Sequence, residues 1–169
     1  LGTPLVSTTL AAQLLLRAAG ESRMEVILAE IAAGAPATVA LLENTDWGDT
    51  RTSCSLDAGG VLQGRKHFVA DATAARLFVV VVGHNGAPAL ALVKSEQLAD
   101  GAIVANTLID QTKRSASVDF SGVKVAQDML VTGSAVVSAL RDHHLLGALL
   151  TAAEATGSAA ACLDTVVEY

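Results

Sequence analysis

Asp142-His143-His144 is the densest group of side chains in this chain that could do chemistry. Imidazole and carboxylate groups bind metals and carry protons, but a zinc site needs three or four ligands around one point. Adjacent residues of a helix point about 100° apart, so the two histidines do not share a face. The group also lacks i,i+4 spacing and a third ligand. We therefore predict no metal site and expect solvated or interface residues, with contact to a ligand or partner subunit as the alternative.

Cys54 and Cys162 are the two cysteines of the chain, and neither belongs to a chemical motif. CxxC spacing is absent, and no histidine motif supports a nucleophilic cysteine. We expect both to pack as small apolar groups in a reducing, cytoplasmic compartment rather than to form a disulfide. His67 alternates with Lys66 and Phe68 in a strand pattern, and we expect its side chain to face solvent.

The balance of charge argues against a nucleic-acid partner. The formal net charge is −6, and Lys and Arg form no cluster that could bind phosphates. Apolar residues make up 51% of the chain, which is high for a soluble protein and leaves surface for a protein partner. The longest continuous apolar run, residues 77–82, is too short to cross a bilayer and is typical of a buried strand. We therefore predict no membrane association.

Around these residues the sequence predicts an α+β chain that begins and ends with helices. Apolar positions at helical spacing predict helices over about 6–19 and 22–33, with Gly20 between them, and together they form a helical hairpin. Helical character returns over 134–169, where Ala-rich sequence carries one broad apolar face. Gly147 interrupts this long C-terminal helix at a cost of about 1 kcal/mol relative to Ala.

Between the helices the pattern changes to period two and to continuous β-branched runs. Turn signals such as Asp100-Gly101 separate these runs. Short strands with tight turns predict a central antiparallel β-barrel or sandwich domain. The predicted strands cover about 38–43, 52–57, 60–70, 77–84, 88–93, 103–107 and 115–123.

Four local motifs, in this order along the chain, resemble motifs of one known family. They are Ile31-Ala32-Ala33-Gly34 with an apolar strand ending in Glu43, then Leu62-x-Gly64-x-Lys66-x-Phe68-Val69, then Asp110-Gln111-Thr112-Lys113-Arg114 with Val118-x-Phe120-x-x-Val123, and last Gly157 with Leu163-Asp164-x-x-x-Glu168-Tyr169. The second resembles the hairpin pattern L-x-G-x-K-x-[WF]-[IV] of the acyl-CoA dehydrogenases. On these motifs nearly all of the chain resembles the middle of a chain of that family.

The resemblance implies a fold, a domain division and a chemistry. It implies a truncated acyl-CoA dehydrogenase fold, with the end of an N-terminal helical domain at 1–35, a middle β-barrel domain at 36–130 and the start of a C-terminal helical domain at 131–169. In the family, a Glu removes the α-proton of an acyl-CoA thioester while FAD accepts the β-hydrogen as hydride. The resemblance therefore implies an oxidoreductase of lipid or steroid side-chain β-oxidation that acts on acyl-CoA.

The resemblance also implies where a flavin would bind. The family motif T-E-P-x-x-G-S-D matches residues 42–49, and W-I-T matches Phe68-Val69-Ala70. Leu42, Gly48 and Ala70 stand where the family has hydroxyl donors, and Trp47 stands in place of a Gly. The cofactor-binding residues that follow from the resemblance are Leu42, Glu43, Trp47, Gly48, Phe68, Val69 and Ala70.

The resemblance places no catalytic residue in this chain. The base that some members carry on the first C-terminal helix falls at Gly147, and a neighbouring Arg falls near Ala148. Trp47 is either a core residue of its loop or a plug in a vestigial flavin site. Four basic residues are expected on a solvated barrel face, with contact to a phosphate of CoA or FAD as the alternative. These four are Arg65, Lys66, Lys113 and Arg114.

Two explanations stand within the family. In the favoured one, the chain is a degenerate subunit of a heteromer, similar to those of actinobacterial steroid side-chain degradation, and FAD is bound by the complex. In the other, it is a fragment of an active but divergent enzyme whose base lies elsewhere. We expect a homo- or hetero-oligomer with another acyl-CoA dehydrogenase chain. Outside the family, the alternative is a non-enzymatic β-barrel interaction module with a vestigial flavin site.

Overall fold

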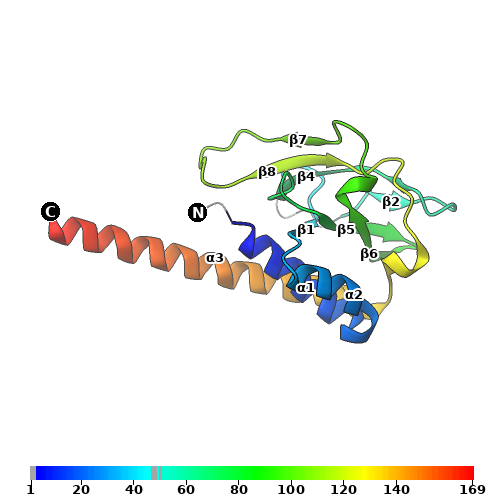
Figure 1. Ribbon diagram of the computed structural model, residues 1–169, viewed down its shortest axis with the longest axis horizontal. Coiled ribbons are helices and arrows are strands. Elements are labelled where there is room, and N and C mark those ends of the chain that lie inside the picture. The colour runs from blue at the N-terminus through cyan, green and yellow to red at the C-terminus, as the bar shows by residue number, and fades with distance from the viewer. Residues whose placement is uncertain (1–2, 47–48, 50) are drawn as a thin grey trace.

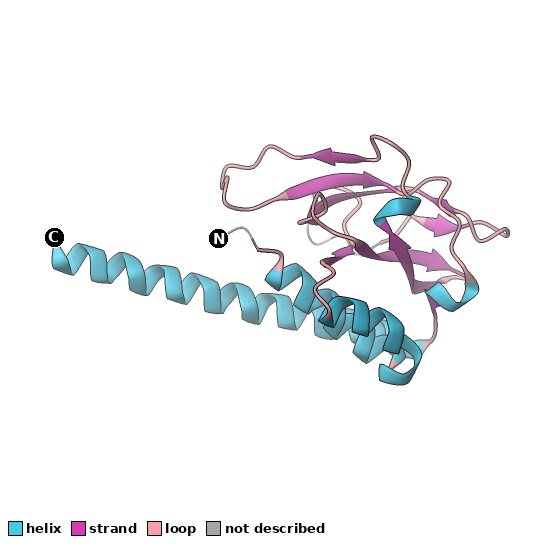
Figure 2. Cartoon of the chain, in the orientation of Figure 1, coloured by secondary structure: helices cyan, strands magenta, loops and turns pink. Residues whose placement is uncertain are grey.

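The computed structural model describes residues 3–46, 49 and 51–169. Trp47 and Gly48, two of the predicted cofactor-binding residues, lie outside the described residues, and so does the choice between a core and a plug role for Trp47. Figure 1 shows three layers, with helices under a central sheet and a smaller sheet above it. Figure 2 shows the same view with helices and strands in different colours.

α1 (Leu5–Ala19) and α2 (Glu21–Ala32) form the expected helical hairpin. Gly20 joins them with a φ of 79°, a left-handed conformation that glycine adopts without the penalty of a Cβ. The apolar stripes of the two helices, which include Leu14 and Ile27, pack in one buried cluster against a face of the central sheet. The hairpin therefore forms the lower layer of the molecule.

β5 (Leu77–His84) and β6 (Ala87–Lys94) form the antiparallel hairpin at the centre of the sheet. Residues 77–82 are all buried, as their continuous β-branched run predicts. Asn85 and Gly86 turn the chain with φ values of 51° and 78°, the two positive values that a type I′ turn requires. Buried hydrophobic clusters therefore pack against both faces of this hairpin.

Four short strands complete the central sheet, and two of them pair with β5 in a parallel direction. β1 (Ala37–Ala40) runs parallel to β5, and so does β2 (Ser55–Leu56). β3 (Leu62–Gln63) and β9 (Leu130–Val131) pair antiparallel at the two edges. The sheet is therefore mixed rather than purely antiparallel as expected, because β1 and β2 both pair with the same edge of β5 and run in its direction.

The second sheet consists of β4 (Arg65–Ala70), β8 (Ser115–Asp119) and β7 (Ile103–Ala105), all paired antiparallel. Its inner face packs on the central sheet, where Phe120 meets Phe78 edge-on with ring centroids 5.7 Å apart. Two 3-10 turns, η1 (Ser95–Gln97) and η2 (Gln127–Met129), follow β6 and precede β9.

Gly64 divides the predicted strand 60–70 into β3 and β4. Its φ is 134°, in the region that favours glycine. A Cβ at this position would lie 2.9 Å from Cα of Cys54, too close for any other residue. The glycine of the hairpin motif therefore has a steric reason: the backbone of β4 passes directly over the segment that precedes β2.

α3 (Ser134–Glu168) begins on the body of the molecule and then leaves it. Its first turns bury Val136 and Ala139 and pack along α1. Residues 151–169 are all exposed, and Figure 1 shows this half of the helix projecting away from the sheets. Cys162 lies there and is exposed, so the expectation of a packed thiol is wrong for Cys162 and holds for Cys54, which is buried.

α3 is also the one helix of the described residues that is long and apolar enough to cross a membrane, judged by length and composition. The helix contains no long continuous apolar run, which is why the prediction of no membrane association did not consider it. Its apolar character comes from many Ala residues between scattered polar ones.

Candidate functional site

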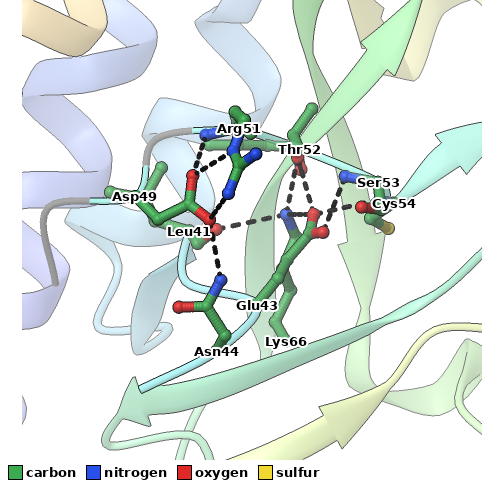
Figure 3. Close-up of polar contacts among 10 residues, drawn as sticks. Leu41, Glu43, Asn44, Asp49, Arg51, Thr52, Ser53, Cys54 and Lys66 are labelled. Atoms are coloured by element: carbon green, nitrogen blue, oxygen red, sulfur yellow. Dashed lines mark hydrogen bonds and ion pairs between the residues drawn. The ribbon is translucent and has the colours of Figure 1, made fainter. Parts of the chain in front are cut away.

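Lys66 on β4 is a charged side chain without exposed surface. Its Nζ donates to Oε1 of Glu43 at 2.6 Å, to Oγ1 of Thr52 at 3.0 Å and to the carbonyl oxygen of Leu41 at 3.2 Å (Figure 3). The three protons of the ammonium group thus have three acceptors. The prediction that Lys66 lies on a solvated face is wrong, because strand alternation turns it inward while Arg65 faces outward.

Glu43 collects the polar groups of the returning loop around one carboxylate. Oε1 also accepts from Oγ1 of Thr52 at 2.6 Å and from the backbone N–H of Cys54 at 3.0 Å, and Oε2 accepts from the N–H of Ser53 at 2.6 Å. Burial acts to raise the pKa of Glu43, but the bonds from Lys66, Thr52 and the two N–H groups outweigh it and lower that pKa to about 2. This carboxylate is ionised and saturated, so it anchors the loop and does not serve as a base.

A second, exposed carboxylate organises the outer part of the same loop. Oδ1 of Asp49 accepts from Nε and the backbone N–H of Arg51, at 2.9 and 3.0 Å. Oδ2 accepts from the same guanidinium at 2.9 Å and from Nδ2 of Asn44 at 3.0 Å (Figure 3). The bonds from Arg51 hold the pKa of Asp49 well below its usual range. Asp49 therefore connects the two ends of the loop on the solvent side.

A small pocket of about 160 Å³ lies where α1, β1, β4 and α3 meet. It brings together three of the predicted cofactor-binding residues, Leu42, Phe68 and Ala70, and adds Leu10 and His143 from the two helices. A larger groove of about 780 Å³ beside α2 contains none of the predicted site residues. The small pocket is therefore the candidate functional site.

A β-bulge gives the pocket its wall. The pairing of β4 with β8 shifts register between Lys66 and Val69, and Phe68 has a φ of 52°, which is unusual for an aromatic residue. The bulge directs His67 and Phe68 toward the pocket, while Val69 turns into the core with 1% of its surface exposed. The predicted residues Val69 and Glu43 are thus not part of the pocket wall.

Most polar side chains around the pocket already have partners. Oγ1 of Thr38 donates to the carbonyl oxygen of Ala70 at 2.7 Å, and Oγ of Ser7 donates to Oδ2 of Asp71 at 2.7 Å. Nδ1 of His67 and Oγ of Ser117 lie 2.9 Å apart, so His67 is tied to β8 rather than free in solvent. Sequence reasoning missed Thr38 and Ser7, since hydroxyls on an ordinary helix and strand carry no motif.

The described residues of this pocket do not fit a flavin ring. Leu42 and Ala70 offer no side-chain donor, and the hydroxyls of Thr38 and Ser7 are engaged elsewhere. The volume is close to that of an engineered cavity that holds benzene, about 150 Å³, which is small for a tricyclic ring system. A pocket of this kind can hold a short apolar group and exclude water from it.

Comparisons with known proteins place the chain by its fold. No family model matches the sequence, and a search of curated proteins finds no match. Among solved structures, butyryl-CoA dehydrogenase from Megasphaera elsdenii matches with a TM-score of 0.80 at 20% identity, over 98% of this chain and 47% of that chain. PigA with FAD and proline matches with a TM-score of 0.81 at 17% identity, over 98% of this chain and 46% of that chain.

A chain in the structure of a two-protein complex is also similar to this chain. The ChsE4-ChsE5 complex from Mycobacterium tuberculosis matches with a TM-score of 0.61 at 21% identity, over 82% of this chain and 38% of the matched chain. This chain therefore has the acyl-CoA dehydrogenase fold, as the motifs implied, and it spans less than half the length of these solved chains.

Proposed function

We propose that this chain is a subunit of an FAD-dependent acyl-CoA dehydrogenase and depends on a second chain for its flavin. The observation that carries the proposal is the contrast between scaffold and pocket. The hairpin that frames the pocket keeps Gly64, Lys66 and Phe68, whereas Leu42 and Ala70 stand at two positions of the pocket wall where the family motif has hydroxyl donors. Similarity to a complex of two proteins, ChsE4 and ChsE5, supports a heteromer.

The proposed reaction is α,β-dehydrogenation of an acyl-CoA thioester in lipid or steroid side-chain β-oxidation, in the cytoplasm. FAD, when bound in the complex, supplies the hydride acceptor. The residues of this chain hold the loop through Glu43 and Lys66 and provide an apolar wall through Phe68, which excludes water from the acyl group. Because Glu43 is saturated with hydrogen bonds, the base that removes the α-proton is assigned to the partner.

Co-expression with a flavin-binding acyl-CoA dehydrogenase chain tests the proposal. We expect a yellow complex that contains one FAD for each pair of chains, and we expect this chain alone to be colourless. A yellow protein with one FAD per copy of this chain would contradict the dependence on a partner. A colourless monomer without affinity for any acyl-CoA would support the interaction module instead.

A further inference from the structure

The turn between β5 and β6 places an asparagine amide beside a free backbone nitrogen. Asn85 and Gly86 form the tip of this hairpin, and both are exposed to solvent. The backbone N–H of Gly86 has no hydrogen-bond partner among the described residues. Gly86 also has no Cβ, and the space that a Cβ would fill is open. This nitrogen is therefore free to react with the side chain that precedes it.

A histidine lies next to the leaving group of such a reaction. Nε2 of His84 and Nδ2 of Asn85 are 3.1 Å apart. An amide NH₂ group only donates, so the neutral imidazole accepts a hydrogen bond from Nδ2 in the resting state. Once the amide carbon is attacked, Nδ2 needs a proton to leave as ammonia. An imidazole at hydrogen-bond distance, once protonated, supplies that proton.

We propose that Asn85 is a site of spontaneous deamidation assisted by His84. The backbone nitrogen of Gly86 attacks Cγ of Asn85 and loses its proton to water. The bond between Cγ and Nδ2 breaks as His84 protonates Nδ2, and ammonia leaves. The remaining succinimide ring is opened by water at one of its two carbonyl groups. Aspartate or isoaspartate then stands at this position, and water is the only other reactant.

The other two asparagines of the chain lack this combination of features. Asn44 and Asn106 are each followed by a threonine, whose β-branched side chain crowds the attacking nitrogen. Their amide groups are also held by neighbours. Nδ2 of Asn44 donates to Oδ2 of Asp49 at 3.0 Å, and Nδ2 of Asn106 donates to Oγ of Ser115 at 2.8 Å. These two residues are therefore controls within the same chain.

The two products of deamidation differ in their effect on the hairpin. Aspartate suits the first central position of a type I′ turn, as asparagine does. Isoaspartate adds a carbon to the backbone, so the turn no longer matches the pairing of His84 with Ala87. β5 and β6 form the centre of the main sheet. We therefore expect faster hydrogen exchange at this end of the hairpin in the isoaspartate form and little change in Asn85→Asp.

Peptide mapping by mass spectrometry follows the reaction in the folded full chain at neutral pH. We expect the peptide that contains Asn85 to become about one mass unit heavier, at least about tenfold faster than the peptides with Asn44 and Asn106. Methylation by an isoaspartyl methyltransferase measures the isoaspartate fraction. Asn85→Gly keeps a turn of the same type and should abolish that methylation at this peptide.

Two variants test the part of His84. His84→Phe keeps a ring without a proton to give, and His84→Gln keeps a hydrogen-bonding group that transfers no proton. We expect both to slow deamidation of Asn85 about tenfold, with circular dichroism establishing that each is folded. Equal rates in wild type and both variants would overturn the role of His84. A rate at Asn85 no higher than at Asn44 and Asn106, or deamidation only after unfolding in urea, would overturn the site itself.

Discussion

The ammonium group of Lys66 is stable inside the protein because Glu43 neutralises it and two further oxygens accept its remaining protons. Moving an ion of this size out of water costs several kcal/mol, and only a close, fully bonded partner offsets that cost. The pair is therefore best understood as an anchor between β4 and the loop after β1. Its contribution depends on both members being present.

Replacing Lys66 by Met tests this account. Met fills the same space but leaves the carboxylate of Glu43 without its cation, and we expect the free energy of unfolding to fall by about 3–5 kcal/mol. Urea unfolding followed by circular dichroism measures the change. The control is Arg65→Met, which removes an exposed ion pair with Asp119, at 2.8 Å, and should cost at most about 1 kcal/mol. Equal losses in the two variants would contradict the role of Lys66.

The lowered pKa of Glu43 makes stability depend on pH. The pKa is about 2 in the folded protein against 4.5 for the free group, so its contribution is complete above about pH 4.5 and is lost as the pH falls toward 2. That contribution is roughly 3 kcal/mol at neutral pH. We expect the difference between wild type and Glu43→Gln in urea titrations to be constant from pH 7 to about pH 5, to fall to less than half of that value near pH 3 and to disappear only as the pH approaches 2. A difference that stays constant with pH would argue against an ionised Glu43.

Ala70 is one of the positions at which this chain lacks a hydroxyl of the flavin-binding motif. If the missing donor at Ala70 weakens flavin binding, Ala70→Thr should raise the fraction of the chain that retains FAD, measured by absorbance after gel filtration. Ala70→Val is the matched control, because Val has the shape of Thr without its hydroxyl. Equal flavin retention in the two variants would show that the donor is not the limiting feature.

At the scale of single residues, the sequence predicts the pocket in part. Leu42, Phe68 and Ala70 do meet at one wall, because their motif positions reflect backbone geometry. The side chains of Val69 and Glu43 point away from this wall. The bulge in β4 turns Val69 into the core, and the buried ammonium group of Lys66 binds the carboxylate of Glu43. Neither the bulge nor the cation is visible in a linear pattern.

At the scale of elements, Gly64 controls how closely β4 can approach the segment before β2. Gly64→Ala introduces a Cβ that would lie 2.9 Å from Cα of Cys54, and it also strains a φ of 134°. We expect a loss of about 3 kcal/mol in the free energy of unfolding, as for other overpacked or strained sites. Gly101→Ala is the control, since it strains a φ of 76° in open space and should cost about 1 kcal/mol. A similar loss at both positions would show that clash contributes little.

The strand predictions succeed where burial is continuous and fail where pairing is short. β5 and β6 form almost as predicted, because a buried β-branched run and an Asn-Gly turn are strong local signals. The parallel pairing of β1 and β2 with β5 was not predicted. Parallel partners are brought together by a long connection, and no local pattern records that. The strand β9, which pairs antiparallel with β6, was missed because two residues are too few to show a strand pattern.

At the scale of the whole molecule, the second half of α3 contributes little to the stability of the body. Removing residues 158–169, all of them exposed, should change the free energy of unfolding by less than about 0.5 kcal/mol. Val136→Ala, at one of the two buried positions of the helix, should cost about 2 kcal/mol. Urea unfolding measures both. A large loss on truncation would show that the projecting half packs in solution.

The exposed half of α3 also defines what a partner would have to cover. Its apolar residues are distributed around the helix, which is typical of a helix that other helices surround. The exposed large apolar side chains there include Leu163, Val166 and Val167. The projecting half of α3 therefore accounts for part of the exposed apolar surface that the 51% apolar content of the sequence predicts.

The carboxylate of Glu43 joins the two ends of the loop between β1 and β2. It accepts hydrogen bonds from the N–H groups of Ser53 and Cys54. These two residues lead into β2, which pairs with the same edge of β5 as β1 does. One side chain therefore fixes both ends of the loop between β1 and β2. A loop clamped at its base can exchange its tip without disturbing the scaffold. The positions of Glu43 and Ser53 are therefore fixed relative to each other by one carboxylate, and foreign sequence grafted between them should leave that closure intact.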